Sequence, residues 1–197
     1  GHIMAASLGN AADFASPFLC AHLSGGTLET VLVSGAGNGL SKAEISVMAC
    51  TSDISYGQLL DRLGVALGYD FPAGEALDKL ALKRLKENGG LVASTNPFCR
   101  LCVKDGKLNL SGLETQLLGK VGSMPKDELA MYAMQRIAES FKYLIEDAKI
   151  RSGASQVLVS GGVAASVFLR TACENSGYMF GKAELCGDNA VGVAIYK

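Results

Sequence analysis

Residues 157–163 read Val-Leu-Val-Ser-Gly-Gly-Val, a hydrophobic run that breaks into two glycines before a helical pattern. In α/β proteins, ligands prefer such a strand–turn–helix junction because helix-end N–H groups converge there. Glycine also lets a flat base or a ribose come close to the backbone. Gly161 and Gly162 are therefore candidate ligand contacts, although an ordinary strand-to-helix turn fits them equally well. No Gly-Lys-Ser/Thr follows, so the turn is not a Walker loop.

A second glycine turn lies far upstream, at Leu23-Ser24-Gly25-Gly26-Thr27, between two apolar runs. Its paired glycines let successive backbone N–H groups face one point, and the flanking hydroxyls add donors, which suits phosphate oxygens. A hairpin turn without any ligand explains the same residues. Leu23, Ser24, Gly25 and Gly26 are the candidate phosphate contacts.

The rest of the chain predicts an alternation of strands and helices, which is an α/β pattern. A helix is expected to begin at Ser52 or Asp53 as N-cap, because both residue types accept hydrogen bonds from helix N–H groups. The other expected elements are strands at 18–23, 27–33, 44–50 and 156–160, a basic helix ending at 89–90, a hairpin at 96–110 around Asp105-Gly106, and helices at 125–151 and 163–175.

Composition indicates one domain or one large lobe with a hydrophobic core. The chain has 197 residues, of which 49% are hydrophobic and 19% charged, with a net charge of −1. No apolar run is long enough to span a membrane and no secretory signal is visible, so we expect a cytoplasmic protein. The densest basic stretch, Lys79 to Lys86, is interleaved with leucines and indicates the solvated side of an amphipathic helix. RNA binding would therefore need charge from elsewhere.

The six cysteines are expected to be reduced and structural. Only Cys99 and Cys102 have suggestive spacing, no second pair completes a zinc site, and they lie in a β-like segment rather than at a helix start.

Polar residues at predicted connections could carry chemistry. Asp61 and Asp78 fall on consecutive helices and could equally be plain surface charges. His2 with a carboxylate such as Asp188 would suit a catalytic metal, but Asp188 could also cap a helix. For His22, we expect a packed residue in the core or at a sheet edge.

Taken together and in this order, these fragments resemble the tRNA threonylcarbamoyladenosine synthase family, long labelled O-sialoglycoprotein endopeptidase or glycoprotease. The resemblance covers nearly the whole chain. The matching stretches are 1–5, 23–27, 53–61, 71–74, 110–113, 160–165 and 186–190.

The resemblance implies an actin/Hsp70/sugar-kinase-like (ASKHA, ribonuclease H-like) fold. Residues 1–197 would form the C-terminal lobe of a two-lobed protein, with a helical insertion at about 52–95 and the N-terminal lobe outside this sequence. The family transfers threonylcarbamoyl groups to tRNA adenosine and uses ATP or an adenylate and a divalent metal, iron or zinc. Its partners would be tRNA, reached through accessory proteins or the other lobe. We expect the fragment alone to be nearly inactive and to self-associate through its exposed inter-lobe face.

Individual roles follow from the same resemblance. His2 and Asp188 would bind the metal, and the turn at 23–26 would hold phosphate. The residues that would hold the ribose and base are Asp61, Gly74, Asp78, Gly161, Gly162 and Ser166.

Three departures from the family pattern keep other functions open. Ser166 stands where an asparagine is usual, Gln58 replaces a frequent glutamate, and Gly187 a threonine. A non-catalytic nucleotide-binding or scaffold paralogue and a small-molecule phosphotransferase of the same superfamily are the alternatives. A peptidase is disfavoured because no Ser/His or Cys/His nucleophile arrangement is readable.

Overall fold

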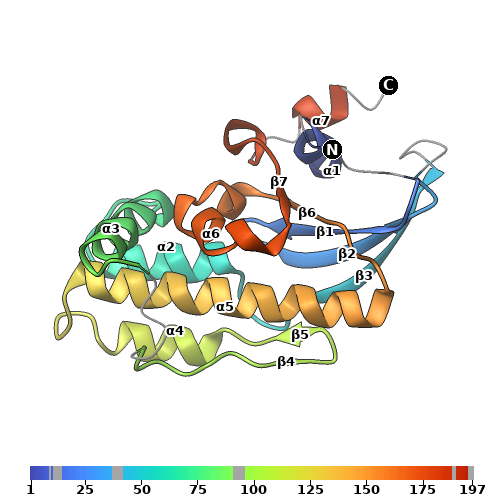
Figure 1. The fold of residues 1–197 in the computed structure, drawn as a ribbon. Helices are drawn as coiled ribbons and strands as arrows, with labels where there is room; N and C mark the ends of the chain where they lie inside the picture. Colours follow the sequence, from blue (N-terminus) through green and yellow to red (C-terminus); the bar gives the residue numbers. More distant parts are fainter. Residues whose placement is uncertain (9, 11–14, 37–41, 91–95, 188–189, 195–197) are drawn as a thin grey trace.

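The computed structural model describes residues 1–8, 10, 15–36, 42–90, 96–187 and 190–194. Its helices and strands follow one another along the chain, with short 3₁₀ turns near the C-terminal end (Figure 1). The elements are α1 (His2–Ser7), β1 (Phe18–Leu23), β2 (Leu28–Ser34), β3 (Glu44–Thr51), α2 (Tyr56–Ala66), α3 (Gly74–Glu87), β4 (Val103–Lys104), β5 (Lys107–Leu108), α4 (Ser111–Leu118), α5 (Lys126–Ser152), β6 (Val157–Ser160), η3 (Gly162–Ala165), α6 (Val167–Ala172), η4 (Glu174–Ser176), β7 (Met179–Phe180), η5 (Ala183–Leu185) and α7 (Ala190–Ala194).

One seven-stranded sheet organises these elements, in the order β4-β5-β3-β2-β1-β6-β7. The first three strands form an antiparallel meander, and β6 then pairs parallel to β1, with Leu19 opposite Val157 and His22 opposite Ser160. Because β1 and β6 run in the same direction, their carboxyl ends meet at one edge of the sheet. That edge carries both glycine turns.

The two faces of the sheet are covered by different helices. Side chains alternate along β1, so Leu19, Ala21 and Leu23 join the large core, to which α5 contributes. Phe18 and Cys20 point to the other face, into a smaller cluster with Ala6 of α1. In Figure 1, α5 and α4 lie on one side of the sheet, and α1 and α7 lie on the opposite side.

The start of α2 differs from the prediction, since the N-cap is Ser55 rather than Ser52 or Asp53. The Ser55 hydroxyl accepts the Gln58 N–H (3.1 Å), and Gln58 Oε1 accepts the Ser55 N–H (3.0 Å), which completes a capping box. Asp53 instead accepts hydrogen bonds from the backbone N–H groups of Leu110 and Ser111, at the start of α4. Burial opposes ionisation of Asp53, but these hydrogen bonds outweigh it and lower the pKa of the carboxyl.

The predicted helix at 163–175 is also wrong as a single element. It consists of η3, a break at Ser166, α6 and η4. The strand at 18–23 and the long helix after Pro125 are confirmed to within two residues. The hairpin is confirmed at its Asp105-Gly106 turn, but its strands, β4 and β5, are much shorter than the expected 96–110. Asp105 and Gly106 both have positive φ, 52° and 72°, as a tight two-residue hairpin turn requires.

All six cysteines are free thiols. Burial raises the pKa of Cys20 to about 12, so this thiol stays protonated at neutral pH. Among the described residues, no helix is both long and apolar enough to cross a membrane.

Candidate functional site

The first glycine turn is fixed to the start of α2. The Ser24 hydroxyl accepts the Thr27 N–H (2.9 Å), closing the hairpin tip, and the Ser55 hydroxyl donates to the carbonyl oxygen of Gly25 (2.7 Å). A Cβ at Gly57 would overlap the Gly25 backbone, so only glycine at 57 lets α2 approach this closely. The tip is therefore held in one position by a helix that follows it in the chain.

The second glycine turn packs directly on the end of β1. Gly161 has φ +92°, and a Cβ on it would overlap the carbonyl oxygen of Leu23. Its N–H donates to the carbonyl oxygen of Cys186 (3.0 Å), which ties the segment before Asp188 to this turn. Gly161 therefore packs β6 against β1. The next residue, Gly162, lines the cavity described below.

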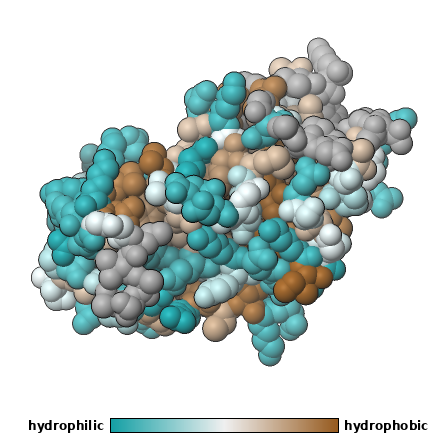
Figure 2. Space-filling view, in the orientation of Figure 1, coloured by the Kyte–Doolittle hydropathy of each residue, from teal (hydrophilic) through white to brown (hydrophobic). Residues whose placement is uncertain are grey.

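Both turns contribute to one cavity of about 630 Å³, which we call the glycine cavity. Figure 2 shows apolar surface gathered between α3 and α6, where Leu82, Val163 and Val167 belong to the cavity lining. The cavity brings together six of the predicted site residues: Gly25, Asp61, Gly74, Asp78, Gly162 and Ser166. Leu23, Ser24, Gly26 and Gly161 shape the turns beside it without lining it.

Asp61 connects α2 to the beginning of α3. Its Oδ1 accepts the backbone N–H groups of Ala73 (2.8 Å) and Gly74 (3.3 Å). Both hydrogen bonds fall on the same oxygen, and no described residue donates to Oδ2.

Asp78 is buried, and its carboxylate is used within the protein. It accepts the Ser166 hydroxyl (2.6 Å) and the N–H groups of Val167 (3.1 Å) and Phe168 (3.1 Å). Ser166 also caps α6 by accepting the Leu169 N–H (3.0 Å). Asp78 thus holds the first turn of α6 against α3, which is a positioning role that the sequence did not indicate.

The two histidines lie on the face of the sheet that α1 covers, opposite the large core. His2 is in the first turn of α1, and the ring centroids of His2 and His22 are 4.4 Å apart. The Nδ1 atom of His2 is buried and has no hydrogen-bond partner in the part of the chain that the structure describes. Burial, followed by the neighbouring His2, lowers the pKa of His22, so this imidazole is neutral at pH 7. Asp188 lies outside the described residues.

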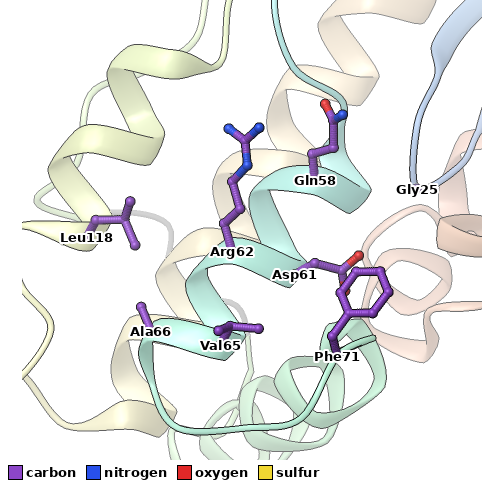
Figure 3. Close-up of a pocket in the computed structure, with 8 residues that line it drawn as sticks. All are labelled: Gly25, Gln58, Asp61, Arg62, Val65, Ala66, Phe71 and Leu118. Carbon is purple, nitrogen blue, oxygen red and sulfur yellow. The ribbon is translucent and has the colours of Figure 1, made fainter.

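A second, more open hollow of about 770 Å³ adjoins the glycine cavity, and we call it the α2–α4 hollow. The two share Gly25 and Asp61. Figure 3 shows Val65 and Ala66 of α2 on its floor, with Leu118 of α4 on one side and Phe71 on the other. Phe71 is 75% exposed, which leaves an aromatic ring at the entrance to this hollow.

Comparison with known proteins identifies the family. The family model for tRNA N6-adenosine threonylcarbamoyltransferase matches residues 1–195. The chain belongs to this family. Curated members include proteins named tRNA N6-adenosine threonylcarbamoyltransferase from Neorickettsia sennetsu (28% identical), Caulobacter vibrioides (31%) and Granulibacter bethesdensis (32%). The matches cover 98 to 99% of this chain and 54 to 59% of those relatives, so the chain spans little more than half of their length.

The structural comparison supports the predicted fold. The crystal structure of HypF from T. kodakarensis superimposes with a TM-score of 0.51 at 20% identity, covering 76% of this chain and 20% of that one. The seven-stranded mixed sheet, the family and this neighbour agree with the ASKHA-like α/β fold expected from the sequence.

Three residues of the site region were missed or assigned other roles by sequence reasoning. Ser55 and Gly57 position the first glycine turn, and the Ser-x-x-Gln pattern of the capping box was the available signal for the former. His22 was expected only to pack, and its place beside His2 depends on how α1 crosses the sheet.

Proposed function

We propose that this chain forms the nucleotide-binding part of a threonylcarbamoyltransferase, and that the whole protein transfers a threonylcarbamoyl group to an adenosine of tRNA. One structural observation supports nucleotide binding independently of the family match. Gly25, Gly74 and Gly162 line the glycine cavity, yet a Cβ at each would meet nothing within 4 Å, and none has positive φ. The fold itself does not require glycine there, whereas close approach of a ligand to the backbone does.

The residues of the cavity suggest how ATP or an adenylate would bind. Phosphate oxygens would face the N–H groups of Gly25 and Gly26, since those of Ser24 and Thr27 bond within the turn, and the adenosine would lie beside Gly162 at the start of η3. We assign Oδ2 of Asp61 to a ribose hydroxyl, since Oδ1 is occupied by Ala73 and Gly74. Asp78 would act by fixing Ser166 at the cavity wall.

The family resemblance also implies a divalent metal, iron or zinc. His2 fits such an ion because its buried Nδ1 has no partner among the residues described by the structure, and Asp188 would supply a carboxylate. When bound, the ion would polarise the carbamoyl carbonyl toward attack.

The acceptor RNA would be held mainly by other surfaces. With a net charge of −1, this chain offers little attraction for phosphates, and it spans little more than half of its relatives. We propose that accessory proteins and the remainder of the protein supply the basic contacts to tRNA, in the cytoplasm.

A substitution at Gly162 tests the nucleotide site. Gly162→Val places a side chain in open cavity space without straining the backbone, so it should weaken ATP binding at least tenfold, about 1.4 kcal/mol, while leaving the unfolding midpoint unchanged. Isothermal titration calorimetry of this chain with ATP measures the change. Gly112→Val, on the exposed side of α4, is the matched control. Equal ATP affinity of the two variants would refute the assignment of the cavity.

A second function, nucleotide binding without transfer, is favoured by one observation. The Ser166 hydroxyl donates its hydrogen bond to Asp78, so it cannot also donate to a nucleotide. The usual family pattern has an asparagine at this position, whose amide can donate. Transfer of labelled threonylcarbamoyl to tRNA by the whole protein, with its accessory proteins present, separates the two. ATP binding with no transfer would support the non-catalytic alternative.

A further inference from the structure

The imidazole of His22 lies beside that of His2, a residue proposed above to hold the metal. His22 is at the carboxyl end of β1 and shares the parity of Phe18 and Cys20, so it faces α1 rather than the large core. The His2 and His22 rings come from different elements and converge with a centroid distance of 4.4 Å and an angle of 35° between their planes. The pair sits directly beside the two glycine turns.

Hydrogen bonding leaves one nitrogen of His22 open. Its Nδ1 lies 3.2 Å from Ser160 Oγ, on the strand that pairs with β1. The Ser160 hydroxyl donates to the carbonyl oxygen of Ala21 (3.4 Å), so its oxygen can accept the Nδ1–H of His22. This tautomer puts the lone pair on Nε2, which has no hydrogen-bond partner among the described residues. Metal-binding histidines are oriented in this way, by a hydrogen bond from the nitrogen that does not bind the ion.

His2 provides an independent observation. A buried imidazole nitrogen without a partner is costly, and most such atoms are satisfied by protein, water or an ion. In addition, α7 packs against the start of α1, where a Cβ on Gly192 would overlap the carbonyl of Gly1. The last described helix, α7, therefore lies in the neighbourhood of His2.

We infer that His22 is a ligand, together with His2, for a divalent transition metal of the kind that prefers imidazole, such as zinc, iron or cobalt. Ser160 is then the positioning residue that orients the His22 ring. The inference rests on the metal site proposed at His2, and it adds a ligand that the resemblance to the family does not assign.

The test uses metal alone as the probe. His22→Asn keeps a nitrogen near the place of Nδ1 and removes Nε2, so the contact with Ser160 can persist while the open nitrogen is lost. We expect this variant to bind Zn²⁺ at least about tenfold more weakly than the unmodified chain, and His2→Ala to do the same. In the unmodified chain, Co²⁺ should produce paramagnetic shifts on the ring protons of both histidines. Ser160→Ala should weaken Zn²⁺ binding about tenfold, as expected for an orienting partner.

The possible failures are distinguishable. If His22→Asn binds Zn²⁺ within twofold of the unmodified chain while His2→Ala does not, the His22 assignment is overturned and the metal site at His2 stands. If the unmodified chain binds no Zn²⁺, both are overturned. A thiolate-to-cobalt charge-transfer band that disappears in Cys102→Ser would place the ion on the exposed cysteine and overturn the inference as well. The thermal midpoint of each variant separates lost binding from lost folding.

Discussion

Gly161→Ala should destabilise the protein more than any other single substitution considered. We expect the free energy of unfolding to fall by about 4 kcal/mol or more, because alanine is strained at φ +92° and its methyl group would overlap the Leu23 carbonyl. Relief of that overlap would separate β1 from β6, the central parallel pair of the sheet. Urea unfolding followed by circular dichroism measures the loss, and an unfolded variant at zero denaturant is within the expected range.

The neighbouring Gly162→Ala is the matched control. Gly162 has no positive φ, and a Cβ there has open space, so this change should alter stability by less than about 1 kcal/mol. If both alanine variants unfold at the same urea concentration, the close packing of Gly161 on β1 is not important for stability.

Asp78→Ala should have the second-largest effect, a loss of about 3 kcal/mol. The substitution removes the acceptor for the Val167 and Phe168 N–H groups and for the Ser166 hydroxyl, and the Phe168 N–H is buried. Each buried donor left without a partner costs about 1 to 3 kcal/mol, offset where water can enter. Chemical denaturation gives the magnitude, and amide hydrogen exchange should show faster exchange at the start of α6.

Glu75→Ala provides the comparison on the same helix. Glu75 is exposed, and its partner among the described residues is Lys79 at the helix surface, so its removal should leave the unfolding midpoint unchanged. Protection of the α6 amides that survives in Asp78→Ala would show that the carboxylate does not hold that helix.

Sequence patterns correctly predicted those helices and strands that depend mainly on residues close together in the chain. The strand at 18–23 is an apolar run that ends at a glycine turn, and the long helix after Pro125 keeps one apolar face for its whole length. Helix starts were less certain, because Ser52, Asp53 and Ser55 can each cap a helix. The choice is made by tertiary contacts, since Asp53 is drawn to α4 and the Ser55 hydroxyl to Gly25. The helix expected at 163–175 breaks at Ser166 because Asp78, from α3, competes for its N–H groups.

The candidate site was predictable to the same degree. Glycines after apolar strands indicated Gly25 and Gly162, and the fold places both at one cavity. The contact between His22 and His2 could not be predicted from the sequence, because it depends on α1 lying across the face of β1 opposite the large core. The internal use of Asp78 was equally hidden, since its partners lie 88 to 90 residues away along the chain.

The pairing of β1 with β6 determines at which stage of folding the glycine cavity can form. His22 of β1 pairs with Ser160 of β6, 138 residues later, and these two strands lead into the turns that bring Gly25 and Gly162 to the cavity, so the cavity can form only after everything between the two strands has been made. Contacts of such high sequence separation form late and slowly. During refolding, ATP binding at the proposed site should therefore be among the last properties to return, well after the α-helical signal has recovered.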